Sequence, residues 1–187
     1  MNTKSNNVSS SVRRIVLTGA PGTGKSTVVQ AMEAQGFSVM KEVSREYWEE
    51  TGYGEGGSDP WRNLIAFSKA LWKLRAEQHK AADWLSGSVF YDRSILDILA
   101  YMDAGEKSIP EEMNPSRFPY HEDVFIFPPW EQIYEMDEGR WEPYSTCNAI
   151  HQSLVDTYTA AGYRLVIVPH ASVQERVDFM LHHLRDH

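Results

Sequence analysis

The sequence predicts an α/β fold in which a parallel β-sheet carries helices on both faces. Short apolar runs alternate with segments of helical spacing along most of the chain, an order typical of β-α-β units. A glycine-rich stretch with a lysine, residues 19–27, lies between the first predicted strand and the first predicted helix. Polar residues end the first three predicted strands, and parallel sheets bind ligands at the carboxyl ends of their strands. This edge of the sheet is therefore the predicted position of the site.

The strands are predicted from short runs of apolar and β-branched residues, which cover residues 13–18, 37–41, 89–91, 124–127 and 163–168. The helices are predicted from apolar residues at helical spacing, over residues 26–35, 44–50, 59–85, 95–102, 130–138 and 145–161. Asp59 and Pro60 predict the start of the long third helix. Ser172 and Glu175 form the pattern of a capping box for a last helix. The proline-rich residues 104–122 predict a loop.

Length and composition favour a single domain over residues 13–187, with a disordered tail over residues 1–12 and a lid segment around residues 128–145. The formal net charge of -8 argues against binding to nucleic acids or anionic membranes in general, because both need a basic surface. No apolar run reaches the roughly 18 residues of a membrane span. Cys147 is the only cysteine, so no intramolecular disulfide can form, which fits a cytoplasmic protein. We interpret Cys147 as a packing residue in a helix, with a reactive thiol as the alternative.

The glycine-rich stretch has the spacing G-x-x-x-x-G-K-S of a phosphate-binding loop, the Walker A pattern. Glycines let backbone N–H groups approach phosphate oxygens, and the following helix adds the positive end of its dipole. Lys25 is expected to reach the β- and γ-phosphates, the Ser26 hydroxyl to hold Mg²⁺, and Thr27 to lie near the α-phosphate. The alternative is a glycine-rich turn with an incidental Lys-Ser. The predicted nucleotide-binding residues are Gly19, Ala20, Pro21, Gly22, Thr23, Gly24, Lys25, Ser26 and Thr27.

Asp92 follows the third predicted strand, where a carboxylate can hold Mg²⁺ directly or through water. The alternative is an ordinary aspartate in the turn that ends a strand. The next residue is Arg93 and not a glutamate, so the pair that activates water in ring-forming ATPases is missing. The sequence Asn-Lys-x-Asp, which reads guanine in common GTPases, is also missing.

Glu42 ends the second predicted strand and is the candidate general base, because a kinase must accept or orient the proton of the acceptor hydroxyl. Arg45 lies three residues later on the same helical face and is a candidate for holding the acceptor. The alternative is an exposed Glu–Arg pair at the start of a helix. Glu46 and Asp97 are rival candidates for the base.

Arg93 and Arg140 are the candidates for stabilising the negative charge of a phosphoryl group in transfer, an effect that an inserted arginine can supply. Arg140 lies between the fourth and fifth predicted strands, where a lid is expected, and a solvated loop arginine is the alternative. Arg93 is also predicted to contact the acceptor. The seven histidines show no spacing typical of metal ligands.

Taken in order, these motifs resemble the AAA-type ATPase/kinase-like domain family that includes the bacterial nicotinamide riboside kinase domain. The resemblance extends over about residues 13–184 and rests on the phosphate loop, Glu42-Val43-Ser44-Arg45-Glu46, Tyr91-Asp92-Arg93-Ser94, Asp97 with Tyr101, Arg140, Val168-Pro169 and Glu175-Arg176-Val177. Deoxynucleoside kinases have a similar acidic-Arg-Ser sequence after the third strand and a carboxylate base after the second.

The resemblance implies the three-layer P-loop NTPase fold of the nucleoside and nucleotide kinases, with a five-stranded parallel sheet in the order 2-3-1-4-5. It implies ATP and Mg²⁺ as cofactors. It also assigns roles in the site to Glu42, Arg45, Asp92, Arg93 and Arg140.

We therefore expect an ATP-dependent small-molecule kinase that phosphorylates a hydroxyl of a nucleoside or a ribosyl compound, with Lys25, Glu42, Arg93 and Arg140 as its catalytic residues. One alternative is an ATPase or nucleotide-switched module that acts on a protein or lipid partner, and another is a binding protein that has lost catalysis. The loop at residues 169–172 is the expected position of the nucleotide base. A homodimer is compatible with the sequence.

Overall fold

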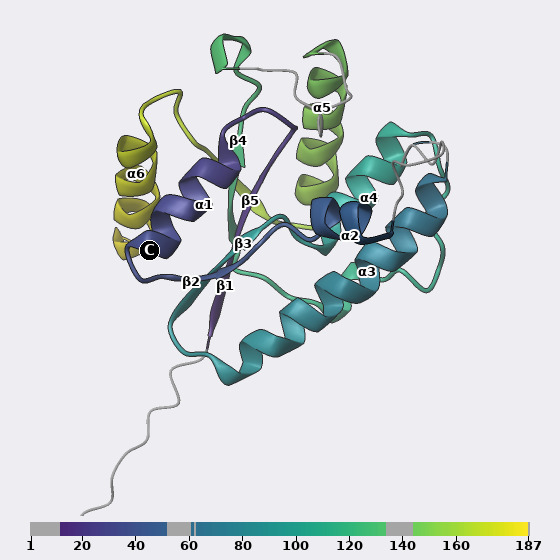
Figure 1. Cartoon of the computed structure of the whole chain (residues 1–187), viewed down its shortest axis with the longest axis horizontal. Helices are drawn as coiled ribbons and strands as arrows, with labels where there is room; N and C mark the ends of the chain where they lie inside the picture. The colour runs from purple at the N-terminus through teal and green to yellow at the C-terminus, as the bar shows by residue number, and fades with distance from the viewer. Residues whose placement is uncertain (1–11, 52–60, 62, 134–143, 187) are drawn as a thin grey trace, which may run out of the picture.

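A parallel sheet of five strands forms the centre of the protein (Figure 1). The structure is a computed structural model that describes residues 12–51, 61, 63–133 and 144–186. The strands are β1 (Arg13–Gly19), β2 (Ser38–Met40), β3 (Ser88–Asp92), β4 (Asp123–Phe127) and β5 (Arg164–Ile167). Their order is β2-β3-β1-β4-β5, and every neighbouring pair is parallel. The strand order and the fold class expected from the sequence are confirmed.

Helices cover both faces of this sheet, as Figure 1 shows. One face carries α1 (Lys25–Ala34) and α6 (Val173–Asp186), and the other carries α4 (Ile95–Ala104) and α5 (Tyr144–Ala160). The long α3 (Leu64–Ala81) packs on α4, and α2 (Ser44–Thr51) lies near it. Short 3₁₀ turns are η1 (Ala82–Trp84), η2 (Pro115–Arg117) and η3 (Glu131–Ile133).

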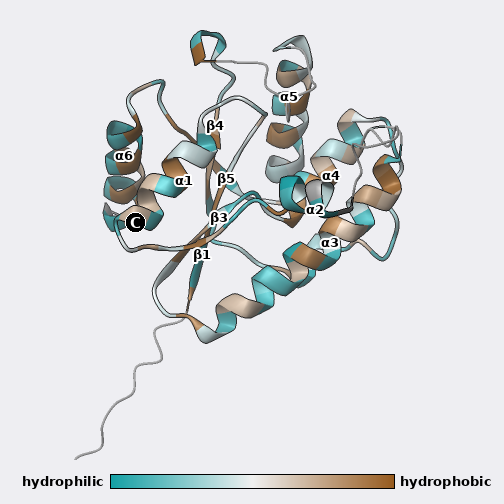
Figure 2. Ribbon diagram, viewed as in Figure 1, coloured by the Kyte–Doolittle hydropathy of each residue, from teal (hydrophilic) through white to brown (hydrophobic). Residues whose placement is uncertain are grey.

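The core follows from alternation along the strands, because successive side chains point to opposite faces of a sheet. In β1, Ile15 and Leu17 pack toward α1 and α6, whereas Val16 between them packs toward α4 and α5. Strands buried on both faces have continuous apolar sequences, and Figure 2 shows this hydrophobic colour along the central strands. Cys147 is buried in the cluster beneath α5, which confirms its interpretation as a packing residue.

Local differences from the predicted elements concern their ends. As described, the third helix begins at Leu64 with Asn63 before it and ends at Ala81, where the turn η1 replaces its predicted last residues. The predicted start at Asp59 and Pro60 lies outside the described residues, as does most of the predicted helix over 130–138, of which only η3 is described. The predicted loop over 104–122 contains one 3₁₀ turn, η2. In the described part of the chain, no helix is long and apolar enough to cross a membrane.

The end of β1 lies very close to the backbone of β4. Gly19 has a φ of 149°, and a Cβ there would come within 2.5 Å of the Phe127 carbonyl oxygen on β4. Only glycine fits so close to a neighbouring backbone. The chain can therefore leave the sheet at this point and turn into α1.

Candidate functional site

The loop between β1 and α1 lies where the sequence places it and has a suitable conformation for binding phosphate. Gly24, directly before α1, has a φ of 76°, in the left-handed region that glycine adopts at little cost. The helix begins at Lys25, so its unpaired N–H groups and the positive end of its dipole lie at the loop. This combination binds anions in general.

Lys25 is buried at the start of α1, with 5% of its surface exposed. Burial and, to a smaller extent, the nearby Arg93 lower the pKa of its ammonium group to about 8, and the raising effect of Asp92 and Glu42 only partly opposes them. A buried ammonium group of this kind is stabilised by an anionic ligand. A phosphate group bound in the loop should therefore stabilise the charged form of Lys25.

Ser26 and Asp92 connect α1 to the end of β3. The Ser26 hydroxyl donates to Asp92 Oδ2 at 3.3 Å, whereas the buried Asp92 Oδ1 has no hydrogen-bond partner among the described residues. Burial raises the pKa of Asp92, and Lys25 opposes that shift. The described chain contains no cluster of three or more His, Cys, Asp or Glu side chains that could hold a metal. Ser26 and Asp92 nevertheless suit Mg²⁺, which usually takes one or two protein oxygens and completes its shell with phosphate and water.

Glu42 follows β2 and is held by four donors. Its Oε1 accepts from Arg75 Nη2 at 2.8 Å, from the Ser44 hydroxyl at 2.7 Å and from the Ser44 backbone N–H at 3.1 Å. Its Oε2 forms an ion pair with Arg93 Nε. Burial by itself would raise the pKa of Glu42, but the two arginines and Ser44 outweigh it and lower that pKa to about 2. Glu42 is thus a fixed carboxylate anion.

Arg75 is the site residue that the sequence reasoning missed. It lies on α3 with 2% of its surface exposed, and its Nε and Nη1 atoms have no hydrogen-bond partner in the described chain. Phe67, Leu71 and Arg75 lie four residues apart, so the arginine continues an apolar helix face. A charge in such a stripe is the sequence signal that could have found it, because a buried charge needs a partner.

Arg93 has the most constrained backbone of the site residues. Its φ is 73°, which is uncommon for a residue with a side chain and is often found at functional sites. Its backbone N–H donates to Leu17, and its guanidinium donates to the Gly19 carbonyl at 3.2 Å and lies over the Tyr101 ring at 5.3 Å. Arg93 therefore connects Glu42 to the first residue of the phosphate loop.

The two rival candidates for the base lie in different surroundings. Asp97 is buried, and both its oxygens accept hydrogen bonds, one from Thr18 and the other from the Ser94 backbone and Tyr158. Ser94 and Asp97 also form the capping box of α4, and Asp97 lines the cavity described next. Glu46 is exposed on α2 and does not line the cavity described next. Arg140 lies outside the described residues.

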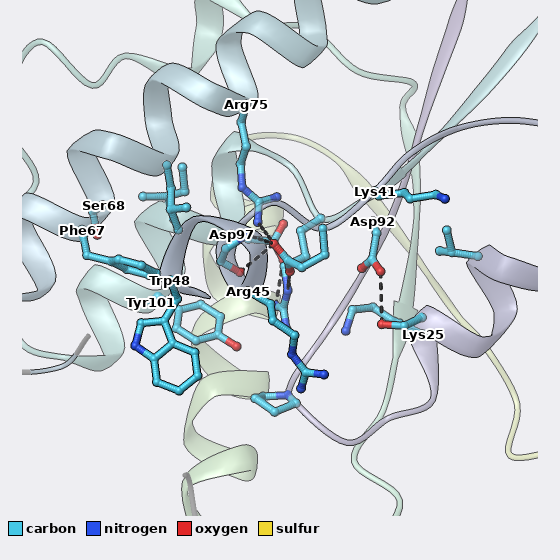
Figure 3. Close-up of a pocket in the computed structure, with 18 of the residues that line it drawn as sticks. Lys25, Lys41, Arg45, Trp48, Phe67, Ser68, Arg75, Asp92, Asp97 and Tyr101 are labelled. Atoms are coloured by element: carbon cyan, nitrogen blue, oxygen red, sulfur yellow. Dashed lines mark hydrogen bonds and ion pairs between the residues drawn. The ribbon is translucent and has the colours of Figure 1, made fainter. Parts of the chain in front are cut away.

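One cavity of about 520 Å³ joins these residues. In Figure 3, Lys25 and Asp92 lie on one side, Trp48, Phe67 and Tyr101 lie on the other, and the guanidinium groups of Arg45 and Arg75 lie between them. The cavity therefore has a charged side at the phosphate loop and an aromatic side between α2, α3 and α4. The predicted residues Lys25, Ser26, Glu42, Arg45, Asp92 and Arg93 all line it.

The sequence matches a family model described as an AAA domain over residues 14–176. A search of curated proteins gave no match.

Several solved structures share the fold. Deoxyadenosine kinase from M. mycoides with bound dATP is 15% identical, with a TM-score of 0.68 over 92% of this chain and 99% of that chain. Thymidylate kinase from Ehrlichia chaffeensis is 14% identical, with a TM-score of 0.63 over 93% of this chain and 99% of that chain. The NadR protein in complex with NR is 15% identical, with a TM-score of 0.68 over 94% of this chain and 51% of that chain. At these identities the likeness concerns the fold.

Proposed function

The chain belongs to the AAA domain family, and on that premise we propose that it is an ATP-dependent kinase which phosphorylates a hydroxyl group of a small molecule such as a nucleoside. The observation that carries the proposal is the cavity in which Lys25 of the phosphate loop and the Glu42 carboxylate face the same space. A group that binds phosphate and a group that can orient a hydroxyl are the two parts that phosphoryl transfer needs.

The aromatic side of the cavity supports an acceptor with a planar ring. Trp48, Phe67, Leu71 and Tyr101 line this side, and Trp61 stacks on Tyr101 with ring centroids 5.9 Å apart. Arg75 lies at the boundary between the aromatic and the charged parts, with donor atoms that no described residue satisfies. A nucleoside fits this arrangement, because its base can pack on the rings while its ribose hydroxyls lie near Glu42.

In the proposed reaction the oxygen of the acceptor hydroxyl forms a bond with the γ-phosphorus of ATP, and the bond from that phosphorus to the bridging oxygen of ADP breaks. Glu42 orients the hydroxyl and takes its proton late, which a weak base can do when the transition state is loose. Lys25 neutralises charge on the β- and γ-phosphates, and Arg93, with Arg140 from the lid, is proposed to neutralise the moving group. Mg²⁺ held by Ser26 and Asp92 would screen the phosphate oxygens.

The test is transfer of the γ-phosphate from labelled ATP across a panel of nucleosides and ribosyl metabolites. We expect at least one phosphorylated product, formed together with ADP. Release of ADP without any phosphorylated acceptor, at a rate that the panel does not change, would contradict the kinase proposal and favour an ATPase that acts on another partner.

A further inference from the structure

The two oxygens of the Glu42 carboxylate lie in unequal surroundings. Oε1 accepts three hydrogen bonds, from Arg75 Nη2 at 2.8 Å, from the Ser44 hydroxyl at 2.7 Å and from the Ser44 backbone N–H at 3.1 Å. Among the described residues, Oε2 has one partner, Arg93 Nε. Because each carboxylate oxygen offers about two lone pairs, Oε1 is saturated, whereas Oε2 can still accept a hydrogen bond from a ligand.

Oε2 is also the oxygen on the side of the phosphate loop. Arg93 pairs with it through Nε and donates through Nη1 to the Gly19 carbonyl at 3.2 Å, so one guanidinium joins Oε2 to the first residue of the loop. The Glu42 side chain lines the cavity and is 20% exposed, so a ligand can reach it. A hydroxyl bound at Oε2 would lie toward the loop, where a phosphate is expected.

The two residues that hold Oε1 come from different helices. Ser44 begins α2, two residues after Glu42, so its N–H and its hydroxyl turn back onto the carboxylate. Arg75 lies on α3, and in Figure 3 its side chain extends from that helix toward the middle of the cavity. Arg75 is 2% exposed, and its Nε and Nη1 have no hydrogen-bond partner among the described residues. Its charge therefore depends on Glu42, and water cannot easily replace that contact.

We propose that Ser44 and Arg75 are positioning residues for phosphoryl transfer, which hold Oε1 and leave Oε2 as the oxygen that accepts from the acceptor hydroxyl. The inference rests on the proposed function in that Glu42 orients this hydroxyl, whose proton would pass to Oε2. A carboxylate held at one oxygen cannot rotate freely, so the acceptor meets an atom in a fixed position. Orientation of this kind speeds the reaction more than it strengthens binding.

The test measures transfer of the γ-phosphate from labelled ATP by the full chain with Mg²⁺, to the nucleoside of the panel that reacts fastest. Ser44→Ala should lower kcat by about 10-fold and leave the KM for the nucleoside within about 3-fold. Ser44→Thr, which keeps the hydroxyl, should restore most of the rate. In a Glu42→Gln background, Ser44→Ala should cost less than about 2-fold, because a residue that acts through Glu42 then has nothing to position.

Ser116→Ala is the matched control. The Ser116 hydroxyl and backbone N–H donate to Asn114 Oδ1, two residues earlier, at 2.7 and 3.0 Å, and Ser116 does not line the cavity. This variant should keep the wild-type kcat. An unchanged kcat in Ser44→Ala would overturn the inference. An equally large loss in the Glu42→Gln background would also overturn it, because Ser44 would then act independently of Glu42.

A second readout needs no acceptor. When the glutamate carboxyl carbons carry an NMR-active isotope, the signal that is lost in Glu42→Gln belongs to Glu42, and its change with pH reports the pKa of that carboxyl. Burial by itself would raise this pKa, but the arginine and serine partners lower it to about 2. It should therefore rise in Ser44→Ala and in Arg75→Met, and stay unchanged in Ser116→Ala.

The titration separates failure of the inference from failure of the proposed function. A Glu42 titration that is the same in Ser44→Ala and Arg75→Met as in the wild type would overturn the inference, whatever the wild type phosphorylates. A shifted titration in a protein that phosphorylates no acceptor would support the holding of Oε1 by these residues and overturn the proposed function alone.

Discussion

Arg75 Nη2 donates to Glu42 Oε1 at 2.8 Å, across 33 residues of sequence, and so joins the middle of α3 to the end of β2. Arg93 pairs with the other oxygen of the same carboxylate. One anion held between two buried cations has little freedom to move, and its position relative to the phosphate loop is fixed through the contact of Arg93 with the Gly19 carbonyl. The central catalytic candidate is therefore placed by contacts from three separate segments.

Removal of Arg75 should destabilise the protein. Arg75→Met is expected to lower the free energy of unfolding by about 3 kcal/mol, because breaking the buried ion pair leaves the Glu42 carboxylate without one of its two cationic partners. Urea unfolding at pH 7 measures this change. Arg45→Met is the matched control: Arg45 is an exposed arginine that lines the same cavity, and we expect a change within about 0.5 kcal/mol. Equal stability of Arg75→Met and the wild type would contradict a structural role for the pair.

The low pKa of Glu42 makes its contribution to stability depend on pH. Its pKa in the folded protein is about 2, below the ordinary value of 4.5, so the folded state favours the ionised form. The stabilisation is fully present above about pH 4.5 and is lost as the pH falls toward 2. The difference in unfolding free energy between the wild type and Glu42→Gln should thus shrink between pH 5 and about pH 3, as measured by urea unfolding. A difference that stays constant over this range would show that Glu42 has an ordinary pKa.

Unlike the Glu42 carboxylate, the Lys25 ammonium group should destabilise the folded protein, because its pKa is lowered from 10.5 to about 8. Between these values the unfolded chain binds more protons than the folded one, so the stability of the wild type should rise with pH. Lys25→Met is expected to be more stable than the wild type at pH 7 without ligand, and this advantage should narrow toward about pH 10. The same variant should bind ATP far more weakly. A Lys25→Met protein that is less stable at pH 7 would contradict a destabilising buried ammonium group.

Asp92 should matter for nucleotide binding only when Mg²⁺ is present. Asp92→Asn is expected to raise the Kd for ATP with Mg²⁺ by about 10-fold or more, since a carboxylate binds this cation much better than an amide does. With EDTA in place of Mg²⁺, the variant should bind ATP as well as the wild type or better, because a negative charge near the phosphates is gone. Calorimetry under both conditions checks this. The same loss of affinity with and without Mg²⁺ would argue against a metal role.

The sequence predicted those parts of the site that depend on residues close to one another along the chain. Local sequence patterns predicted the phosphate loop between a strand and a helix, and the residues that end β2 and β3. The alternation of strands and helices predicted a sheet with helices on both faces. The strand order came from the resemblance to a family of known fold and is confirmed. The roles of Glu42, Arg93 and Arg140 stay predictions.

The parts that the sequence did not predict depend on contacts between distant segments. Arg75 reaches Glu42 only because α3 packs against α4 beside the end of β2, and no local pattern encodes that contact. Trp130 and His170 meet because β4 and β5 are neighbours in the sheet. Asp97 reads in sequence as a free carboxylate, whereas in the fold its oxygens are occupied by Thr18, Ser94 and Tyr158.

The most direct test of the account is the number of phosphorylated acceptor molecules formed for each ADP released. This ratio is measured for the wild type and for Glu42→Gln under the same conditions, with an acceptor that the panel has identified. We predict a ratio near one for the wild type. For Glu42→Gln we predict a rate of transfer reduced by about 100-fold or more, with ATP affinity unchanged, because the loss of a general base typically costs this much. Transfer by Glu42→Gln at the wild-type rate would contradict the assignment of Glu42, and a wild-type ratio near zero would contradict the kinase itself.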